Sequence, residues 1–119
     1  DKTKTRSISL IIGAFLIGIA ISFANFVPYT GLIFLWILAG IGQTLADMPS
    51  ETLIGENIEP KDQGKVYGSH FAFSHLWWAI AYPIAGFLGT RFPENEFLYG
   101  GMLTLALATI AILAFKSSK

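Results

Sequence analysis

The chain has 119 residues, of which 53% are apolar and 13% are charged, and its formal net charge is zero. Soluble domains carry about 25% charged residues, so this composition indicates a membrane protein. The balanced charge provides no basic surface for nucleic acid, and we expect no nucleic-acid partner. The absence of cysteine excludes disulfides and thiolate metal sites. The start at Asp1 and the length predict a piece of a larger protein.

Four long apolar runs follow one another along the chain. A helix needs about 20 apolar residues to cross the hydrocarbon core, and irregular backbone cannot lie in lipid. The sequence therefore predicts an all-α integral membrane fold, with 1–119 as a single transmembrane unit. Its four transmembrane helices are expected at about 7–27, 31–57, 64–90 and 97–115. Runs of this length argue against the alternative, a soluble helical bundle with a rich core.

The distribution of lysine and arginine predicts the orientation in the membrane. With four spans, the two termini and the connection between spans two and three lie on one side, and only Arg91 lies on the other. The positive-inside rule then places both termini in the cytoplasm, in a multi-pass protein of the cell membrane (inner or plasma membrane). The bases on the cytoplasmic side are Lys2, Lys4, Arg6, Lys61, Lys65, Lys116 and Lys119.

Polarity separates the four spans into two kinds. Spans one and four are apolar nearly all round, so we expect them to be peripheral and to face lipid. Span three has a polar arc on a helical wheel, which must face protein or water. A stripe of small residues, Ala81, Ala85 and Gly89, lies beside this arc and would permit close approach of another helix. The polar arc consists of His70, Ser74, His75, Trp78 and Tyr82.

Span two carries Gln43, Asp47 and Glu51 on one side. If its helix continues to Asn57, Glu51 lies about 9 Å and Asp47 about 15 Å inside the cytoplasmic end. Counted from the start of span three at residue 64, His70 lies about 9 Å in and His75 about 16 Å in. The spacing therefore predicts two carboxylates and two imidazoles in one layer, provided that the two helices turn these faces toward each other.

Ionisable groups inside a membrane usually line a pathway or a proton relay. Burial brings the pKa of carboxylic acids and of imidazoles toward neutrality, which suits the uptake and release of protons. The same groups are ligands for Ni²⁺, Co²⁺ or Zn²⁺. We therefore predict Asp47, Glu51, His70 and His75 as proton groups or metal ligands, with Gln43, Ser74 and Tyr82 along the same pathway.

Two simpler interpretations stay open. In the first, the second helix ends at Met48 and Pro49 starts a loop, which leaves Asp47 and Glu51 in water. His70 would then be a packing residue near the interface. No nucleophile with a matching base and no cofactor motif is present in the sequence, so we expect neither an enzyme nor a resident cofactor.

Several motifs resemble those of the major facilitator superfamily of secondary transporters. The pattern comprises a glycine pair in AGIGQ (39–43), a mid-helix proline at Pro49, an acidic helix end in LIGEN (53–57) and a basic-glycine entry in QGKVYG (63–68). The segment YPIAGFLG (82–89) is similar to the glycine-proline motif of the family's antiporters, with tyrosine at its first position where a glycine is expected.

The resemblance implies a twelve-helix fold in two halves, of which this chain would be helices nine to twelve. The partners would be the lipid bilayer, the missing N-terminal helices and a small-molecule or metal-ion substrate. The resemblance also implies proton-coupled efflux by alternating access. The segment 64–79, with its two histidines, resembles nickel-resistance-type exporters of this superfamily. The residues expected to allow close packing and bending are Gly40, Gly42, Pro49, Pro83 and Gly86.

The alternative function is that of a non-transporting four-helix membrane subunit or partner-binding module. A small four-helix multidrug exporter would also fit the length. Those exporters carry an essential glutamate in their first span, and 7–27 contains no acidic residue. That third interpretation is therefore excluded.

Overall fold

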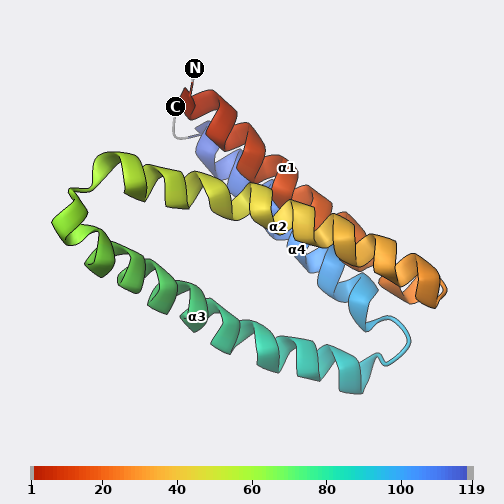
Figure 1. The fold of residues 1–119 in the computed structure, drawn as a ribbon. Coiled ribbons are helices and arrows are strands. Elements are labelled where there is room, and N and C mark those ends of the chain that lie inside the picture. The colour runs from red at the N-terminus through yellow and green to blue at the C-terminus, as the bar shows by residue number, and fades with distance from the viewer. Residues whose placement is uncertain (1, 118–119) are drawn as a thin grey trace.

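The computed structural model describes residues 2–117, which form four long helices (Figure 1). Each helix is long and apolar enough to cross a membrane. Within 2–117 there is no β-strand. The predicted all-α fold with four membrane-spanning helices is confirmed. The elements are α1 (Lys2–Ser22), the short 3₁₀ helix η1 (Ala24–Phe26), α2 (Tyr29–Asn57), α3 (Pro60–Arg91) and α4 (Glu96–Ser117).

Prolines set two of the helix boundaries. Val27, which precedes Pro28, has an extended backbone with φ −110° and ψ 150°, as expected because the proline ring disfavours the helical region for the residue before it. Helix α2 therefore starts directly after Pro28. Helix α1 itself ends at Ser22, before the predicted limit, and is followed by η1. Pro60 occupies the first turn of α3, where its missing N–H costs no hydrogen bond.

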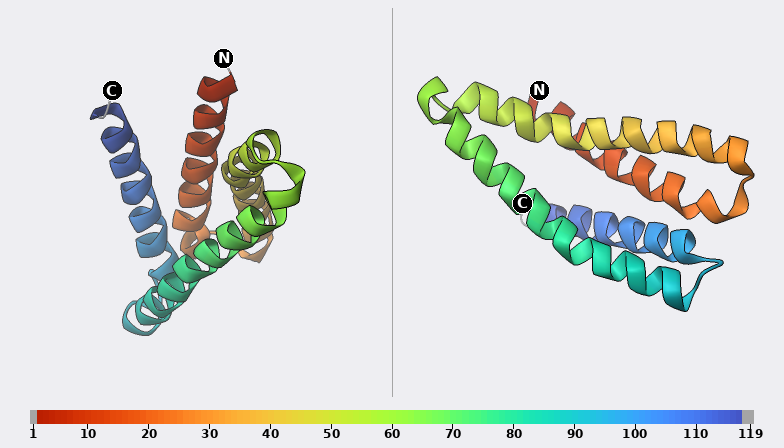
Figure 2. Two further views of the ribbon diagram at one scale, coloured as in Figure 1. Left: turned by 90° about the vertical axis from the view of Figure 1, so that its left-hand side faces the viewer. Right: turned by 60° about the horizontal axis from the view of Figure 1, so that its bottom comes forward.

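Helix α1 lies at the centre of the packed part of the molecule, between α2 and α4 (Figures 1 and 2). It contains most of the buried helical residues, whereas α3 contains none in the described part of the chain. Large apolar side chains of α1 such as Ile8, Ile12 and Ile19 nevertheless stay exposed, and the expectation that span one faces lipid stays a prediction for the intact protein. The buried residues of α1 are Gly13, Gly18, Ala20 and Ser22.

The close helix contacts are made by glycines. A Cβ built on Gly13 would lie 2.7 Å from the Ala46 backbone nitrogen, so α1 and α2 touch backbone to backbone. A Cβ on Gly101 of α4 would lie 2.7 Å from Ser22 Cα. Lipid provides no hydrophobic force between helices, so association depends on such close packing. Large apolar side chains correspondingly point outward, and none in 2–117 is fully buried.

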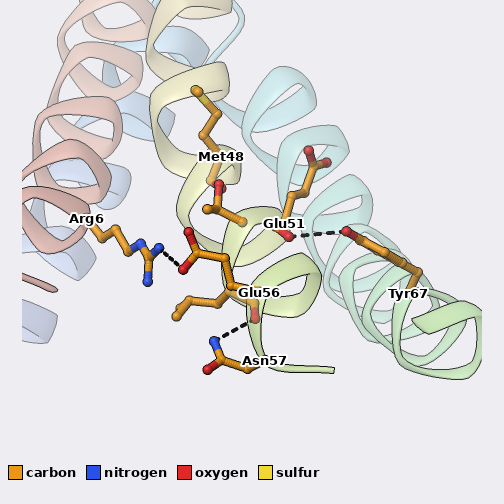
Figure 3. Close-up of polar contacts among 8 residues, drawn as sticks. Arg6, Met48, Glu51, Glu56, Asn57 and Tyr67 are labelled. Atoms are coloured by element: carbon orange, nitrogen blue, oxygen red, sulfur yellow. Dashed lines mark hydrogen bonds and ion pairs between the residues drawn. The ribbon is translucent and has the colours of Figure 1, made fainter. Parts of the chain in front are cut away.

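Two polar contacts tie the ends of the packed helices together. At the end that carries the termini, Arg6 of α1 forms an ion pair with Glu56 of α2 (Figure 3). At the opposite end, Asn25 Oδ1 of η1 accepts a hydrogen bond of 3.0 Å from the backbone N–H of Leu98. Asn25 thus caps the first turn of α4 from a distant part of the chain, because that turn has N–H groups without helical partners. Lys119, one of the bases used to predict orientation, lies outside the described residues.

The glycine pair of α2 offers a matched test of this packing. A Cβ on Gly42 would lie 2.8 Å from the Gly13 carbonyl oxygen, whereas a Cβ on Gly40 meets nothing within 4 Å. We expect Gly42→Ala to destabilise the protein by about 1–3 kcal/mol through overpacking. Gly40→Ala should be neutral or stabilising by up to about 1 kcal/mol, because alanine is the better helix former. Thermal unfolding of the two variants in detergent measures the difference, and equal stabilities would contradict the close contact.

Candidate functional site

Helix α2 continues through Pro49 to Asn57 without a break in its helical assignment. Glu51 therefore lies within the helix, about 9 Å from its end at 1.5 Å rise per residue. The alternative in which the helix ends at Met48 is wrong, and Asp47 and Glu51 are helical residues on the same face.

A serine on the neighbouring helix compensates for the proline. In a regular helix the N–H at position 49 would bond to the Leu45 carbonyl, but Pro49 has no N–H to donate. Ser9 Oγ of α1 donates a hydrogen bond of 2.8 Å to that same carbonyl. Pro49 is buried at this contact. Ser9 therefore satisfies the backbone acceptor that the proline releases, which is how membrane helices tolerate an internal proline.

The exposed side of α2 carries an open groove with a volume of about 400 Å³. Both carboxylic acids that the sequence singled out lie along it, and none of its lining residues is basic. Gly40 lines this groove, whereas Gly42 packs against α1, so the two members of the glycine pair serve opposite faces. The lining residues are Gly40, Gln43, Thr44, Asp47, Met48 and Glu51.

Two side chains of α3 fasten the start of this helix to the end of α2. Tyr67 Oη donates a hydrogen bond of 3.2 Å to the Glu51 carbonyl, on the side of α2 away from Arg6 (Figure 3). Gln63 Nε2 donates to the carbonyl oxygens of Gly55 and Ile58 at 3.3 and 3.0 Å. From these contacts the two helices diverge (Figures 1 and 2). Sequence reasoning did not single out Tyr67 as a contact residue, and its signal was its place about one turn before His70, where the polar arc begins.

The polar arc of α3 is exposed except at the half-buried Ser74, and its histidines differ in their contacts. His75 Nδ1 lies 2.8 Å from the Phe71 carbonyl oxygen. A carbonyl oxygen can only accept, so Nδ1 is the donor in this contact. Ser74 Oγ donates to the His70 carbonyl at 2.9 Å, so this serine bonds to the backbone of its own helix.

The predicted layer of two carboxylates and two imidazoles is not assembled in the structure. Asp47 and Glu51 share the groove on α2, while His70 and His75 lie on α3, which diverges from α2. Within residues 2–117, no group of three or more histidine, aspartate and glutamate side chains is placed to hold a metal ion. Helical depth matched Glu51 with His70, whereas the contact that forms joins Glu51 to Tyr67, one turn earlier on α3, and depth could not supply the lateral distance between the two helices.

The residues predicted for packing on α3 make no such contact with the described part of the chain. An added Cβ on Gly86 or Gly89 would meet nothing within 4 Å. Pro83 lies inside α3 with its side chain exposed, as do Ala81 and Ala85. Their role in packing against a further helix stays a prediction.

Antiparallel apolar helices that are long enough to cross a membrane and that pack through glycines define a multi-pass helical membrane protein. The family model of the Major Facilitator Superfamily matches residues 1–119. The chain therefore belongs to the major facilitator superfamily, whose members are membrane transporters. A search of curated proteins and a search of solved structures found no significant match.

The Ser9–Leu45 contact predicts a coupling between Ser9 and Pro49. Ser9→Ala should destabilise the protein by about 1 kcal/mol, because the Leu45 carbonyl then has no donor. In a Pro49→Ala background, the restored N–H satisfies that carbonyl, so the same serine change should cost much less. A double-mutant cycle by denaturation in detergent measures the difference. Ser7→Ala is the control, since Ser7 Oγ donates to Thr3 O of its own helix; additive effects of Ser9 and Pro49 would contradict the assignment.

Proposed function

We propose that the chain forms the last four helices of a proton-coupled exporter in the cell membrane, with both termini in the cytoplasm. The family membership supports a transporter rather than the non-transporting subunit or partner-binding module. The start of α1, the end of α4 and the α2–α3 connection lie at the same end of the molecule (Figure 1). This arrangement agrees with the distribution of lysine and arginine. The remaining helices of the intact transporter would close the open sides of α2 and α3.

The observation that carries the proposal is the acid-lined groove of α2. Asp47 and Glu51 lie one turn apart on an uninterrupted helix, with Gln43 and Thr44 beside them. Carboxylates within the depth of a membrane are expensive unless they line a pathway, and alternate protonation lets them couple proton and substrate movement. The proposal includes His75 of α3 as a further relay group.

The transported compound is either a small organic molecule or a divalent metal cation such as nickel. The carboxylates of α2 and the imidazoles of α3 would become a metal site only if α2 and α3 approached each other during transport. Alternating access supplies movements of this kind, because the two halves of such a transporter rock about a central site. Both compound types therefore belong in the test.

Proton coupling is tested in everted membrane vesicles that contain the full-length protein. We expect that adding substrate, either ethidium or nickel(II), partly dissipates an imposed pH gradient, as reported by a fluorescent amine. Asp47→Asn and Glu51→Gln should reduce this signal to near background, because an amide cannot carry the proton. The compound that produces the signal identifies the type of substrate.

Glu59→Gln is the matched control. Glu59 lies in the α2–α3 connection, where its exposed carboxylate pairs with Lys61 at 2.7 Å. It is outside the groove, so its removal should leave the proton signal unchanged. Transport that proceeds with no proton movement, or with full proton movement in the Asp47 and Glu51 variants, would overturn the proposed coupling.

A further inference from the structure

Helices α1 and α4 pack closely near one end and diverge toward the other. A Cβ built on Gly18 of α1 would lie 2.6 Å from Leu105 Cδ2 of α4. From this contact the two helices separate toward the end that carries the termini (Figure 2). On α1, Gly18 is buried, Ile11 is half-buried and Lys4 is exposed. On α4, exposure likewise rises from the half-buried Leu105 to the exposed Lys116.

Each of these helices places one lysine on the side that faces the other helix. At about 100° per residue, Lys4 lies about 40° from Gly18 around α1, and Lys116 lies about 20° from Leu105 around α4. At 1.5 Å rise per residue, Lys4 is about 21 Å and Lys116 about 17 Å from the Gly18–Leu105 contact, both toward the termini. The lysine pair, Lys4 and Lys116, therefore lies at similar depth on the two sides of the opening.

Other bases at this end of the molecule are paired with acids, but the lysine pair is not. Arg6 pairs with Glu56, and Lys61 pairs with Glu59. Arg6 lies about 160° from Lys4 around α1, so its ion pair is on the opposite side of that helix. Within residues 2–117, neither member of the lysine pair is in an ion pair. Its two positive charges are therefore available to a ligand.

The surfaces next to the lysine pair are apolar. Neither 7–22 of α1 nor 97–115 of α4 contains a charged residue, so no acid on these helices balances the two lysines. Lysine stems can lie along apolar surface while their ammonium groups reach a polar headgroup. Under the proposed orientation this end faces the cytoplasm, where the leaflet carries anionic lipids and basic sites between helices bind their headgroups.

We propose that Lys4 and Lys116 together bind the phosphate group of an anionic phospholipid, whose acyl chains lie against the diverging ends of α1 and α4. The phosphate matches the two ammonium groups in charge, and the chains match the apolar surfaces beside them. A zwitterionic lipid brings its own cation and meets repulsion from the same lysines. This lipid site lies on different helices from the two that carry the proposed transport residues, and it does not depend on the transported compound.

The test is equilibrium binding of radiolabelled phosphatidylglycerol to the full-length protein in neutral detergent. We expect saturable binding for which unlabelled phosphatidylglycerol competes strongly and phosphatidylcholine with the same acyl chains competes weakly. Lys4→Gln and Lys116→Gln should each weaken the binding about fivefold, the contribution of one lysine near an anionic lipid surface. Lys4→Arg keeps the charge and should retain most of the affinity. Thermal unfolding without added lipid should be the same for all variants.

Lys65→Gln is the matched control, because Lys65 is an exposed lysine at the same end of the molecule but on α3. Equal weakening by Lys65→Gln and Lys4→Gln would indicate general attraction to the basic end and would overturn the lysine pair as a site. Equal competition by phosphatidylcholine would overturn recognition of the headgroup charge. Displacement of the lipid by inorganic phosphate, and not by chloride at the same ionic strength, would show a site for free phosphate and overturn the lipid assignment.

Discussion

The Ser9 hydroxyl supplies to Leu45 the hydrogen bond that Pro49 cannot. Without that donor, the helix would have an unsatisfied carbonyl at membrane depth, at a cost of about 1–3 kcal/mol. With it, α2 continues to Asn57 as one helix. The position of both groove carboxylates depends on that continuity. The Ser9–Leu45 contact between α1 and α2 therefore helps to hold Asp47 and Glu51, although these carboxylates lie on the face of α2 that points away from α1.

The contacts of α1 with both of its neighbouring helices are close because they are made by small residues. Small residues let α1 lie backbone to backbone against α2 at Gly13 and against α4 at Gly101, so that a hydroxyl as short as that of Ser9 can reach across. Large apolar side chains are left for lipid or for further helices of the transporter. The bilayer removes the usual reward for burying them inside the protein, which explains why the buried set consists of glycine, alanine, serine and proline.

The polar side chains that we propose for transport lie on two helices with different chemistry. Helix α2 contributes negative charge and hydrogen-bonding groups from a packed position, while α3 contributes aromatic faces and two imidazoles from an unpacked one. The contacts of Tyr67 and Gln63 hold the two at their connected ends and leave the rest free to separate. Such an arrangement suits a transporter, because a site assembled from walls that can move apart is accessible from alternating sides.

The sequence by itself determined the four spans, the all-α class and the stacking of Asp47 and Glu51, because these depend on local period and on the cost of polar backbone in lipid. Only the tertiary structure decided that Gly42 packs while Gly40 stays open, that Ser9 completes the bond missing at Pro49, that Asn25 caps α4, and that α1 is central. It also separated the histidines from the carboxylates. Each of these depends on which helix lies beside which, and at what distance. Periodicity along one helix carries no information on that point.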